Sequence, residues 1–368
     1  MSVRPPASRK EEADWLRLIR SENLGPATFM ALMTRYGTAG AALSALPDLV
    51  ASRELRRPIR IASDKVLEAE RAAAEHHRVT HVFLGAPGYP ERLAAIHAPP
   101  PVLCVRGELG QLSNAPLAVV GARRASGGGL TLAKRFADAF GEAGHAVVSG
   151  LALGIDRAAH EAALYSGTVA VVAGGVDRPT PEAHIAFADQ IVDEGGAVIS
   201  EMPLGYWPRS RDYPRRNRLI AGLCDAVLVV EAGESSGALH TARYAADENR
   251  DVYALPGSVL DPRAIGALRL IREGATMAID PDDILRNVRT AEPDSAPLLP
   301  GFAEDGAGFP DPVDVVELVA DALSPTPLSM DELTRAMALP PHAVMAAVME
   351  LELDNRCFRE ANGAVRLP

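Results

Sequence analysis

Seven short apolar runs, separated by helix-length segments, constrain the fold of this chain more than any other feature. They are rich in Val, Ile and Ala and contain almost no polar residue, as in strands that are covered on both faces. The runs are 117–120, 146–148, 168–172, 197–199, 226–230, 252–255 and 275–279. Alternation of such strands with helices predicts an α/β fold, a Rossmann-like doubly wound and mostly parallel sheet. We expect this domain to span residues 81–290.

The first 80 residues have a helical pattern instead. Trp15, Leu18 and Ile19 share one helix face, and Leu24-Gly25-Pro26 breaks the chain before the pattern resumes. We predict a small N-terminal domain over residues 1–80, of the SAM or helix-hairpin-helix type. The turns of helix-hairpin-helix motifs direct backbone amides at DNA phosphates, but a single turn of this kind is also typical of a purely structural connection.

Composition changes again after residue 290. Residues 291–312 are rich in Pro, Gly and acidic residues without a period, which predicts a flexible linker. Residues 313–368 predict a winged helix, with helices that start at Val313, Ser329 and Pro341 and two short strands near the end. Its third helix carries no Lys or Arg. We therefore expect this domain to contact protein or to pack, rather than to read DNA.

The charge of the chain argues both against and for a nucleic-acid partner. A formal net charge of -11 disfavours binding to phosphates, which requires positive charge at the contact. The segment 209–218 departs from this average, because five arginines and one acid, Asp212, give it a local charge of +4. The arginines are Arg209, Arg211, Arg215, Arg216 and Arg218. Such a segment is either a solvated basic loop or a contact surface for a polyanion.

The expected cellular location and the expected state of the cysteines both rest on motifs that the sequence lacks. No apolar run approaches the length of a membrane span, and the start of the chain has no secretory signal, so we expect a cytoplasmic protein without membrane contact. Cys104, Cys224 and Cys357 lie far apart and form no Cys-x-x-Cys pair. We predict buried free thiols rather than a disulfide framework or a zinc cluster.

Ligands of doubly wound sheets bind at the carboxyl ends of the strands, so the loops that follow the strands are informative. The loop 121–129 after the first predicted strand is rich in small residues that let backbone approach a phosphate, and Ser126 is placed to cap the next helix. It lacks both the dinucleotide fingerprint and the Gly-Lys-Ser/Thr of a Walker loop. We therefore predict no nucleotide cofactor, and no catalytic or metal-binding residue.

The loops after the second and fifth runs carry further small and polar residues. Asp156 and His160 lie one helical turn apart; we interpret Asp156 as bracing its loop, with a metal site or a proton relay as the alternative. We assign the same bracing role to Ser236, Gly237 and Thr241. Gly and hydroxyl residues follow several strands, whereas a single bound phosphate requires fewer such loops. This pattern favours an extended ligand.

Aromatic residues alternate with the arginines of the basic segment. Tyr206, Trp207 and Tyr213 are the aromatic residues of the stretch 205–218. Guanidinium groups grip phosphates, and aromatic rings stack on unpaired bases with a gain of ~1–3 kcal/mol per base. The combination predicts single-stranded DNA as the ligand, with these three rings as candidates for base stacking. The alternative is an aromatic-rich loop that packs on the sheet.

These residues carry a dense resemblance to the bacterial DNA-processing protein A family, DprA or Smf. It extends over about residues 85–280, while the flanking domains resemble the arrangement of the family without a diagnostic motif. The matching segments are 89–90, 100–103, 107, 119–123, 149–156, 159–160, 200–201, 213–222, 229–232, 236–241 and 256–257. The chain departs from the family pattern at Gly127-Gly128, where a Tyr often precedes the Gly, and at 177–181, where Asp-x-x-Tyr-Pro is usual.

The resemblance implies a non-catalytic protein that binds and protects incoming single-stranded DNA during natural transformation and loads the RecA recombinase onto it. It also implies a homodimer formed through the Rossmann-like domain. The implied contacts to phosphate and to the strand are Gly121, Ala122, Arg123, Ser126, Gly127, Ser149, Gly150, Arg215, Asn217 and Arg218. We expect Arg123 and Arg218 to be exposed loop residues.

Two other functions fit the same loops. The fold variant is similar to that of phosphoribohydrolases, enzymes that use a Glu after a Pro-Gly-Gly-x-Gly-Thr motif; Tyr244 stands at the corresponding position here. A nucleotide sensor would instead hold one mononucleotide and no polymer. Affinity that rises with oligonucleotide length distinguishes a DNA-binding protein from both.

Overall fold

The computed structural model describes residues 3–51 and 59–288, and parts of the C-terminal region. In that region the described residues are 315–316, 319–320, 323, 329–330, 333–334, 339, 341–353, 356–359 and 364–366. The chain divides into two compact units, Met1–Pro293 and Asp294–Pro368. The predicted linker 291–312 and the predicted helix start at Val313 lie outside the described residues.

The first unit begins with four helices, as the sequence predicts for this region. Ser8 caps the first helix by accepting a hydrogen bond from the Glu11 amide at 3.3 Å. The Trp15 and Phe29 rings join the first two helices, with centroids 5.0 Å apart. The helices are α1 (Arg9–Arg20), α2 (Pro26–Tyr36), α3 (Ala39–Ala51) and α4 (Asp64–His76). They share one apolar core with the following sheet, so the domain boundary at residue 80 stays a prediction.

One sheet with the strand order β1-β2-β6-β5-β4-β3-β7-β8-β9 forms the centre of this unit. All seven predicted strands are confirmed, and β3 to β9 pair in parallel. Two strands that the sequence analysis did not predict, β1 and β2, extend the sheet in antiparallel pairing. The strands are β1 (Val79–Phe83), β2 (Val102–Gly107), β3 (Leu117–Val120), β4 (Val147–Ser149), β5 (Thr168–Val171), β6 (Ala197–Ser200), β7 (Ala226–Val229), β8 (Asp251–Ala254) and β9 (Thr276–Met277).

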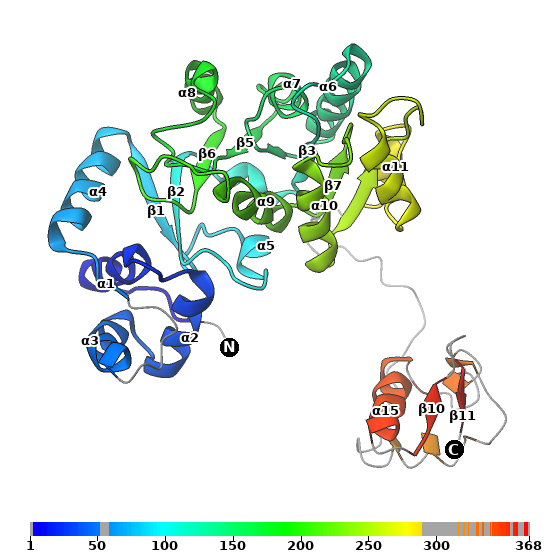
Figure 1. Ribbon diagram of the computed structural model, residues 1–368, viewed down its shortest axis with the longest axis horizontal. Helices are drawn as coiled ribbons and strands as arrows, with labels where there is room; N and C mark the ends of the chain where they lie inside the picture. The colour runs from blue at the N-terminus through cyan, green and yellow to red at the C-terminus, as the bar shows by residue number, and fades with distance from the viewer. Residues whose placement is uncertain are drawn as a thin grey trace, which may run out of the picture. The chain divides into compact units, whose positions relative to one another are not determined.

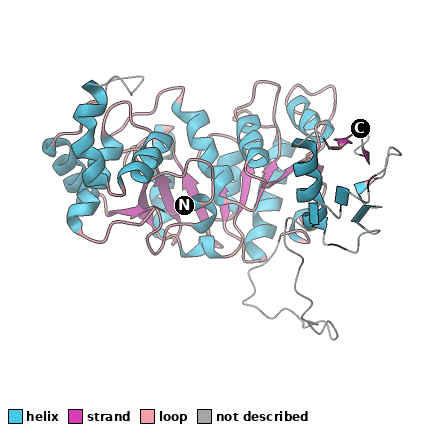
Figure 2. Cartoon of the chain, turned by 90° about the horizontal axis from the view of Figure 1, so that it is seen from below, coloured by secondary structure: helices cyan, strands magenta, loops and turns pink. Residues whose placement is uncertain are grey.

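Helices cover both faces of the sheet (Figures 1 and 2). On one face lie α6 (Gly127–Glu142), α7 (Ile155–Ala162) and α8 (Ile185–Asp193), and Phe136 and Phe140 of α6 pack with the strands there. On the other face lie α9 (Asp212–Leu223) and α10 (Ala238–Asp247). Short helices complete the unit: α5 (Glu91–Ala94), η1 (Gly110–Ser113), η2 (Glu182–His184), α11 (Ile265–Arg272) and α12 (Asp282–Leu285).

The strand order reverses at β3. From β3 the chain proceeds to β4 on one side, and after β6 it returns to pair β7 on the other side. The loops that leave β3 and β7 therefore diverge to opposite faces, which opens a crevice at the carboxyl ends of the two strands. The topology thus places any ligand site at this point.

The second unit contains α15 (Pro341–Leu353), followed by an antiparallel pair, β10 (Phe358–Arg359) and β11 (Val365–Arg366). Val344, Val348 and Leu351 of the helix share a core with Cys357 and Val365. This is the predicted third helix and β-ribbon of a winged helix. All three cysteines of the chain are buried, as predicted. Among the described residues, no helix combines the length and the apolar character that a membrane span requires.

Candidate nucleic-acid interface

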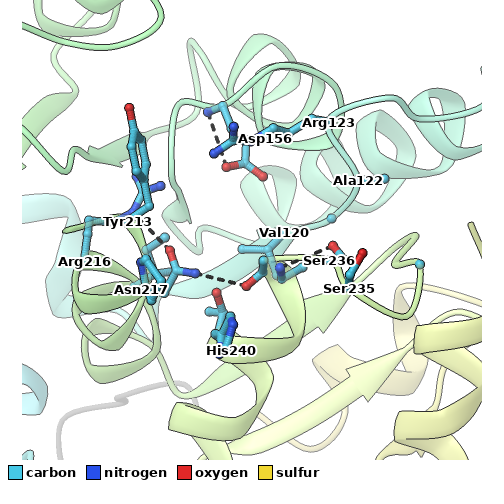
Figure 3. A pocket seen from close by; sticks show the side chains of 18 of the residues that line it. Val120, Ala122, Arg123, Asp156, Tyr213, Arg216, Asn217, Ser235, Ser236 and His240 are labelled. Carbon is cyan, nitrogen blue, oxygen red and sulfur yellow. Dashed lines mark hydrogen bonds between the residues drawn. The ribbon is translucent and has the colours of Figure 1, made fainter. Parts of the chain in front are cut away.

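A cleft of about 690 Å³ lies at the point where the strand order reverses (Figure 3). Its walls are the loop after β3, the loop after β4, the first half of α9, and the segment that leads from β7 into α10. Many of the predicted site residues meet there. These are Gly121, Ala122, Arg123, Asp156, Tyr213, Asn217, Ser236, Gly237 and Thr241.

Close packing fixes the backbone of the loop after β3. A Cβ on Gly121 would lie 2.7 Å from the side chain of Ile155 and 2.9 Å from the carbonyl oxygen of Glu231, so only glycine fits. The Ile155 amide donates to the Ala122 carbonyl at 3.2 Å, which ties this loop to the start of α7. Arg123 and Arg124 therefore project from a rigid base, and both are exposed.

A carboxylate already occupies the start of α6. Ser126 caps this helix by accepting a hydrogen bond from the Gly129 amide at 2.8 Å. Glu231 accepts hydrogen bonds from both the Ser126 amide, at 2.9 Å, and the Ser126 hydroxyl. Neither Ser126 nor Gly127 lines the cleft. The expected cradle therefore needs correction: Glu231 stands at this helix end, where the phosphate was expected.

Hydrogen bonds to a buried carboxylate stabilise the loop after β4. The buried Asp156 carboxylate accepts hydrogen bonds from the Gly150 amide at 3.1 Å and the Ala152 amide at 3.4 Å. Burial raises the pKa of Asp156, although the nearby Arg216 opposes this shift. Ser149 is fully buried and donates to the Val119 carbonyl at 2.6 Å, so it joins two strands and does not border the cleft.

Asp156 and His160 have separate partners. The Nδ1 atom of His160 lies 2.7 Å from the Thr168 hydroxyl in a buried site. Burial, together with the positive charge of Arg216, lowers the pKa of His160 to about 3, so the imidazole is neutral. The two side chains thus stabilise different loops, and their hydrogen bonds do not converge on one ligand.

The arginines of α9 depart most from expectation. The expectation that Arg218 is an exposed loop residue is wrong, because α9 begins at Asp212 and includes Arg215, Arg216 and Arg218. Arg216 is buried and donates to the carbonyl oxygens of Gly150 and Val171. Arg218 lies on the helix rather than in a loop, its side chain is 15% exposed, and it pairs with Glu201 and the Ala98 carbonyl.

Glu201 neutralises a second arginine as well. Its buried carboxylate lies 2.8 Å from Nε of Arg215, whose side chain is only 40% exposed. Both Arg215 and Arg218 are thus engaged by one acid at the end of β6. Neither residue lines the cleft.

Other cations at this edge of the sheet are free. Arg123, Arg124, Arg209 and Arg211 are exposed, and among the described residues none of them has a carboxylate partner within ion-pair distance. The Arg123 guanidinium lies 5.4 Å from the centroid of the Tyr213 ring. Positive charge and an aromatic face therefore meet at the rim of the cleft.

Only one of the three predicted stacking residues lines the cleft, and it is Tyr213. The Tyr206 hydroxyl donates to Asp212 at 2.8 Å and its ring is half-buried; burial and this carboxylate raise its pKa. Trp207 is exposed but lies outside the cleft.

The start of α10 forms the opposite wall. Gly237 is the N-cap of this helix, and its carbonyl accepts a hydrogen bond from the Asn217 amide group at 3.0 Å. Ser236 braces the turn by accepting from the Ala238 amide at 3.4 Å. Thr241 is buried behind it. Asn217 therefore fixes the end of α10 relative to α9.

Six polar residues that line the cleft were not among the predicted site residues: Arg124, Ser210, Arg216, Ser235, His240 and Arg263. Five of them adjoin or lie within segments that the sequence had indicated. Arg263 comes from the loop after β8, where the resemblance covers only Pro256-Gly257, so the sequence held no signal for Arg263 itself. Arg263 pairs with Asp261 at 2.6 Å and is less available than Arg123.

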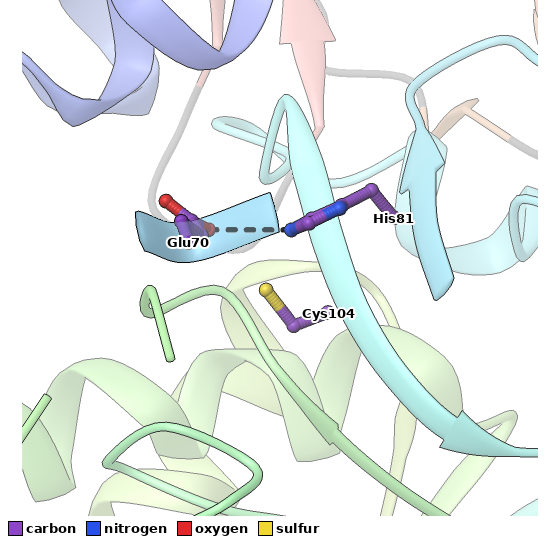
Figure 4. A group of neighbouring side chains, drawn as sticks. All are labelled: Glu70, His81 and Cys104. Carbon is purple, nitrogen blue, oxygen red and sulfur yellow. Dashed lines mark hydrogen bonds and ion pairs between the residues drawn. The ribbon is translucent and has the colours of Figure 1, made fainter. Parts of the chain in front are cut away.

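A second polar cluster lies outside the cleft, where α4, β1 and β2 meet (Figure 4). Ligand-type atoms of Glu70, His81 and Cys104 lie within 4.8 Å of one another. The buried Arg20 guanidinium, however, donates to both Glu70 oxygens, at 2.8 to 3.1 Å, and to the Cys104 sulfur at 3.5 Å. An arginine thus supplies the cation, and the cluster is an ion-pair network between the N-terminal helices and the sheet.

Residues 80–289 match the sequence model of the DNA recombination-mediator protein A family. The chain belongs to this family. Its flanking regions match two further models, a DprA-like N-terminal HHH domain over residues 9–73 and a DprA winged helix domain over residues 310–363. The predicted resemblance and all three predicted domain types are therefore confirmed.

Relatives in the DNA recombination-mediator protein A family match along most of the chain. Protein Smf of Escherichia coli is 37% identical over 288 residues, which is 76% of this chain and 75% of that protein. The X-ray structure of DprA from Streptococcus pneumoniae superimposes with a TM-score of 0.63 at 31% identity, covering 78% of this chain and 99% of that one. DprA from Helicobacter pylori, described for its single-stranded DNA binding mode, has a TM-score of 0.52 at 24% identity and covers 57% and 95% of the two chains. The latter likeness concerns the fold alone.

Proposed function

We propose that this chain binds single-stranded DNA in the cleft between the loops after β3 and β7. The observation that carries the proposal is that two unneutralised guanidinium groups, Arg123 and Arg124, line the same cleft as Tyr213 at the point where the strand order reverses, with Arg123 over the Tyr213 ring. Guanidinium groups bind phosphates, and an aromatic ring accepts an unpaired base. The family membership, and the fact that the Helicobacter relative is described as binding single-stranded DNA, support this proposal.

The contacts divide between ligand groups and supports. Arg123 and Arg124 bind phosphate beside the backbone of Gly121 and Ala122, and the exposed start of α10 at Gly237 provides a further positive end. Tyr213 stacks on a base. Asn217 and Gly150 hold the walls of the cleft in place. The arginines of α9, together with Ser126 and Ser149, act as structural supports.

The wider role that we propose is the one the family resemblance implies. The chain protects incoming single-stranded DNA and loads RecA onto it in the cytoplasm during natural transformation. We also propose a homodimer formed through the Rossmann-like domain. The edge strand β9 supports this, because Met277 and the adjacent Ile279 are 53% and 65% exposed there, and unpaired strand edges favour association.

A hydrolytic function finds less support. Tyr244, which replaces the catalytic Glu of phosphoribohydrolases, does not line the cleft, and the one acid among the described lining residues is Asp156. That carboxylate is buried and accepts backbone hydrogen bonds. Neither group is placed to act as a free general base.

Ligand length tests the proposal. Titration of the purified chain with labelled oligothymidylates should show affinity that rises with length and falls with salt, by about 0.7 log unit per log salt for each neutralised phosphate. Equal affinity for a mononucleotide and a long oligomer would instead identify a nucleotide sensor. Release of free base from a nucleoside monophosphate would identify a hydrolase.

A further inference from the structure

The loops after β5 and β6 form a second rigid surface beside the cleft. The Gly175 amide donates to the Tyr206 carbonyl at 3.0 Å, and the Gly205 amide donates to the Asp177 carboxylate at 2.9 Å. A Cβ on Gly174 would lie 2.9 Å from Pro208, so the two loops approach as closely as glycine allows. The backbone under this surface is therefore fixed before any ligand binds.

An aromatic ring and a cation stand together on this surface. Trp207 is 52% exposed, unusual for so large an apolar side chain, and the Arg178 guanidinium lies 5.1 Å from its ring centroid. Arg178 itself is 43% exposed. We call these two residues the Trp207 platform.

The charge around the Trp207 platform is positive. Arg209 and Arg211 are exposed next to it, while Asp177 and Asp212 face inward and Glu182 is exposed. Asp177 is 8% exposed at its side chain; it holds the Gly205 amide and lies 3.7 Å from Nε of Arg178, whose side chain stays 43% exposed. Asp212 accepts hydrogen bonds from the Tyr206 hydroxyl and the Arg209 amide. The surface offers a phosphate several cations and few exposed carboxylates.

The Trp207 platform is continuous with the cleft. Thr180, two residues after Arg178, has its hydroxyl 3.2 Å from the hydroxyl of Tyr213, which lines the cleft. Ser210, three residues after Trp207, also lines the cleft. A ligand that leaves the cleft past Tyr213 therefore reaches the Trp207 platform along the same edge of the sheet.

We propose that the Trp207 platform is a second subsite for the same DNA strand. A base beyond the cleft stacks on the Trp207 indole, and the adjacent phosphate pairs with Arg178. The proposal rests on single-stranded DNA as the ligand of the cleft and assigns it a longer path than the cleft alone. The occupant is an unpaired strand because stacking needs a free base face, which a duplex conceals.

Intrinsic fluorescence gives a direct test. The chain has two tryptophans, and the other one, Trp15, is 2% exposed in the core of the N-terminal helices. Emission of the wild-type chain should fall when a long oligothymidylate, of about 16 nucleotides, binds. A short oligomer, of about four nucleotides, fills the cleft only and should leave the emission nearly unchanged. In Trp207→Phe the long oligomer should also leave the emission unchanged.

Affinity provides the second readout. Trp207→Ala should weaken binding of the long oligomer by about 5- to 150-fold and leave the short oligomer unaffected, since one stacked base is lost. Arg178→Gln should reduce the salt slope for the long oligomer by about 0.7. Tyr165→Ala is the matched control, because Tyr165 is 77% exposed but precedes β5 and so lies at the opposite edge of the sheet.

The outcomes separate the two proposals. If the wild-type chain binds no oligomer, the DNA-binding function itself fails. If it binds the long oligomer without quenching, or with equal affinity in Trp207→Ala, the cleft stands and the Trp207 platform is overturned. Unchanged thermal melting of Trp207→Ala confirms that any lost affinity comes from the surface and not from unfolding.

Discussion

Arginine has two opposite tasks in this chain, and burial decides which one a given residue performs. Arg123 is exposed and lies over the Tyr213 ring, where its charge is available to a ligand. Arg216 is buried against the carbonyl oxygens of Gly150 and Val171, and burial lowers its pKa to about 10. Arg218 is largely buried and paired with Glu201. Substitutions of these arginines should therefore separate binding from stability.

Arg123→Ala should weaken binding of single-stranded DNA by about 10- to 100-fold, the value of one charge-assisted hydrogen bond lost from a phosphate. Its thermal midpoint should stay unchanged, because an exposed side chain contributes little to the core. Titration followed by fluorescence anisotropy measures the first effect, and calorimetry the second. Arg272→Ala, an exposed arginine of α11 outside the cleft, is the control; equal affinities of the two variants would refute the phosphate contact.

Arg218→Ala should behave in the opposite way. The substitution leaves a buried carboxylate on Glu201 with one partner fewer, which costs about 3 kcal/mol of the free energy of unfolding. Denaturant titration measures the loss, and Arg209→Ala, an exposed neighbour, should change stability by less than about 0.5 kcal/mol. Equal stability of the two variants would contradict the structural role of Arg218.

His81 makes the stability of the first unit depend on pH. Burial disfavours its charged form, but hydrogen bonds with Cys104 and Glu70 outweigh burial and raise the pKa of His81 to about 9. Because the folded pKa exceeds the ordinary value of 6.5, the stabilisation is complete below pH 6.5 and is lost as the pH rises through 9. The thermal midpoint should fall between pH 6.5 and 9.5 more steeply in the wild type than in His81→Gln. Parallel curves would contradict this contribution.

At the scale of elements, the sequence predicted the parallel strands and missed the antiparallel ones. Strands β3 to β9 alternate with helices, and most form apolar runs that periodicity detects. β1 and β2 lie at one side of the sheet, no long helix separates them, and β1 is only partly buried. Their pattern therefore lacks the rhythm on which the prediction depended.

The sequence predicted the position of the cleft but not the partners of its charged residues. Backbone requirements are local, so glycines and caps at the strand ends indicated the cleft from sequence. Partners of charged groups are not local: Glu201 engages Arg215 and Arg218 from another strand end, and Glu231 reaches Ser126 across 105 residues. A count of arginines cannot reveal which of them a distant carboxylate neutralises.

Replacement by alanine should change stability in opposite directions at two glycines, one in the loop after β3 and one at the start of α6. Gly121→Ala drives a Cβ against Ile155 and the Glu231 carbonyl, which should destabilise the chain by about 1–3 kcal/mol and displace Arg123. Gly127 is the first residue of α6, and nothing lies within 4 Å of a Cβ placed there. Gly127→Ala should stabilise by about 0.4–1 kcal/mol. Denaturant titrations that give both variants the same sign would contradict this account of the loop.

At the scale of the whole molecule, an acidic chain carries a basic site because its charges are segregated. The net charge of -11 includes ten acids and four arginines in residues 311–368, whereas four exposed arginines of the first unit, Arg123, Arg124, Arg209 and Arg211, lie at one edge of the sheet. Local charge, rather than the total, decides whether a polyanion binds.

Removal of residues 311–368 should therefore leave the affinity for single-stranded DNA within about twofold of the full chain, because this segment is acidic and belongs to a separate compact unit. Anisotropy titrations of the full and shortened chains at equal salt measure the difference. Near-total loss of binding would assign the winged helix a direct DNA contact.

A crystal structure of the chain with a bound oligothymidylate tests the central claim most directly. We predict phosphates on Arg123 and Arg124 near the start of α10, and a base on the Tyr213 ring. A strand that binds to any other face, with the cleft between β3 and β7 empty, would contradict the account.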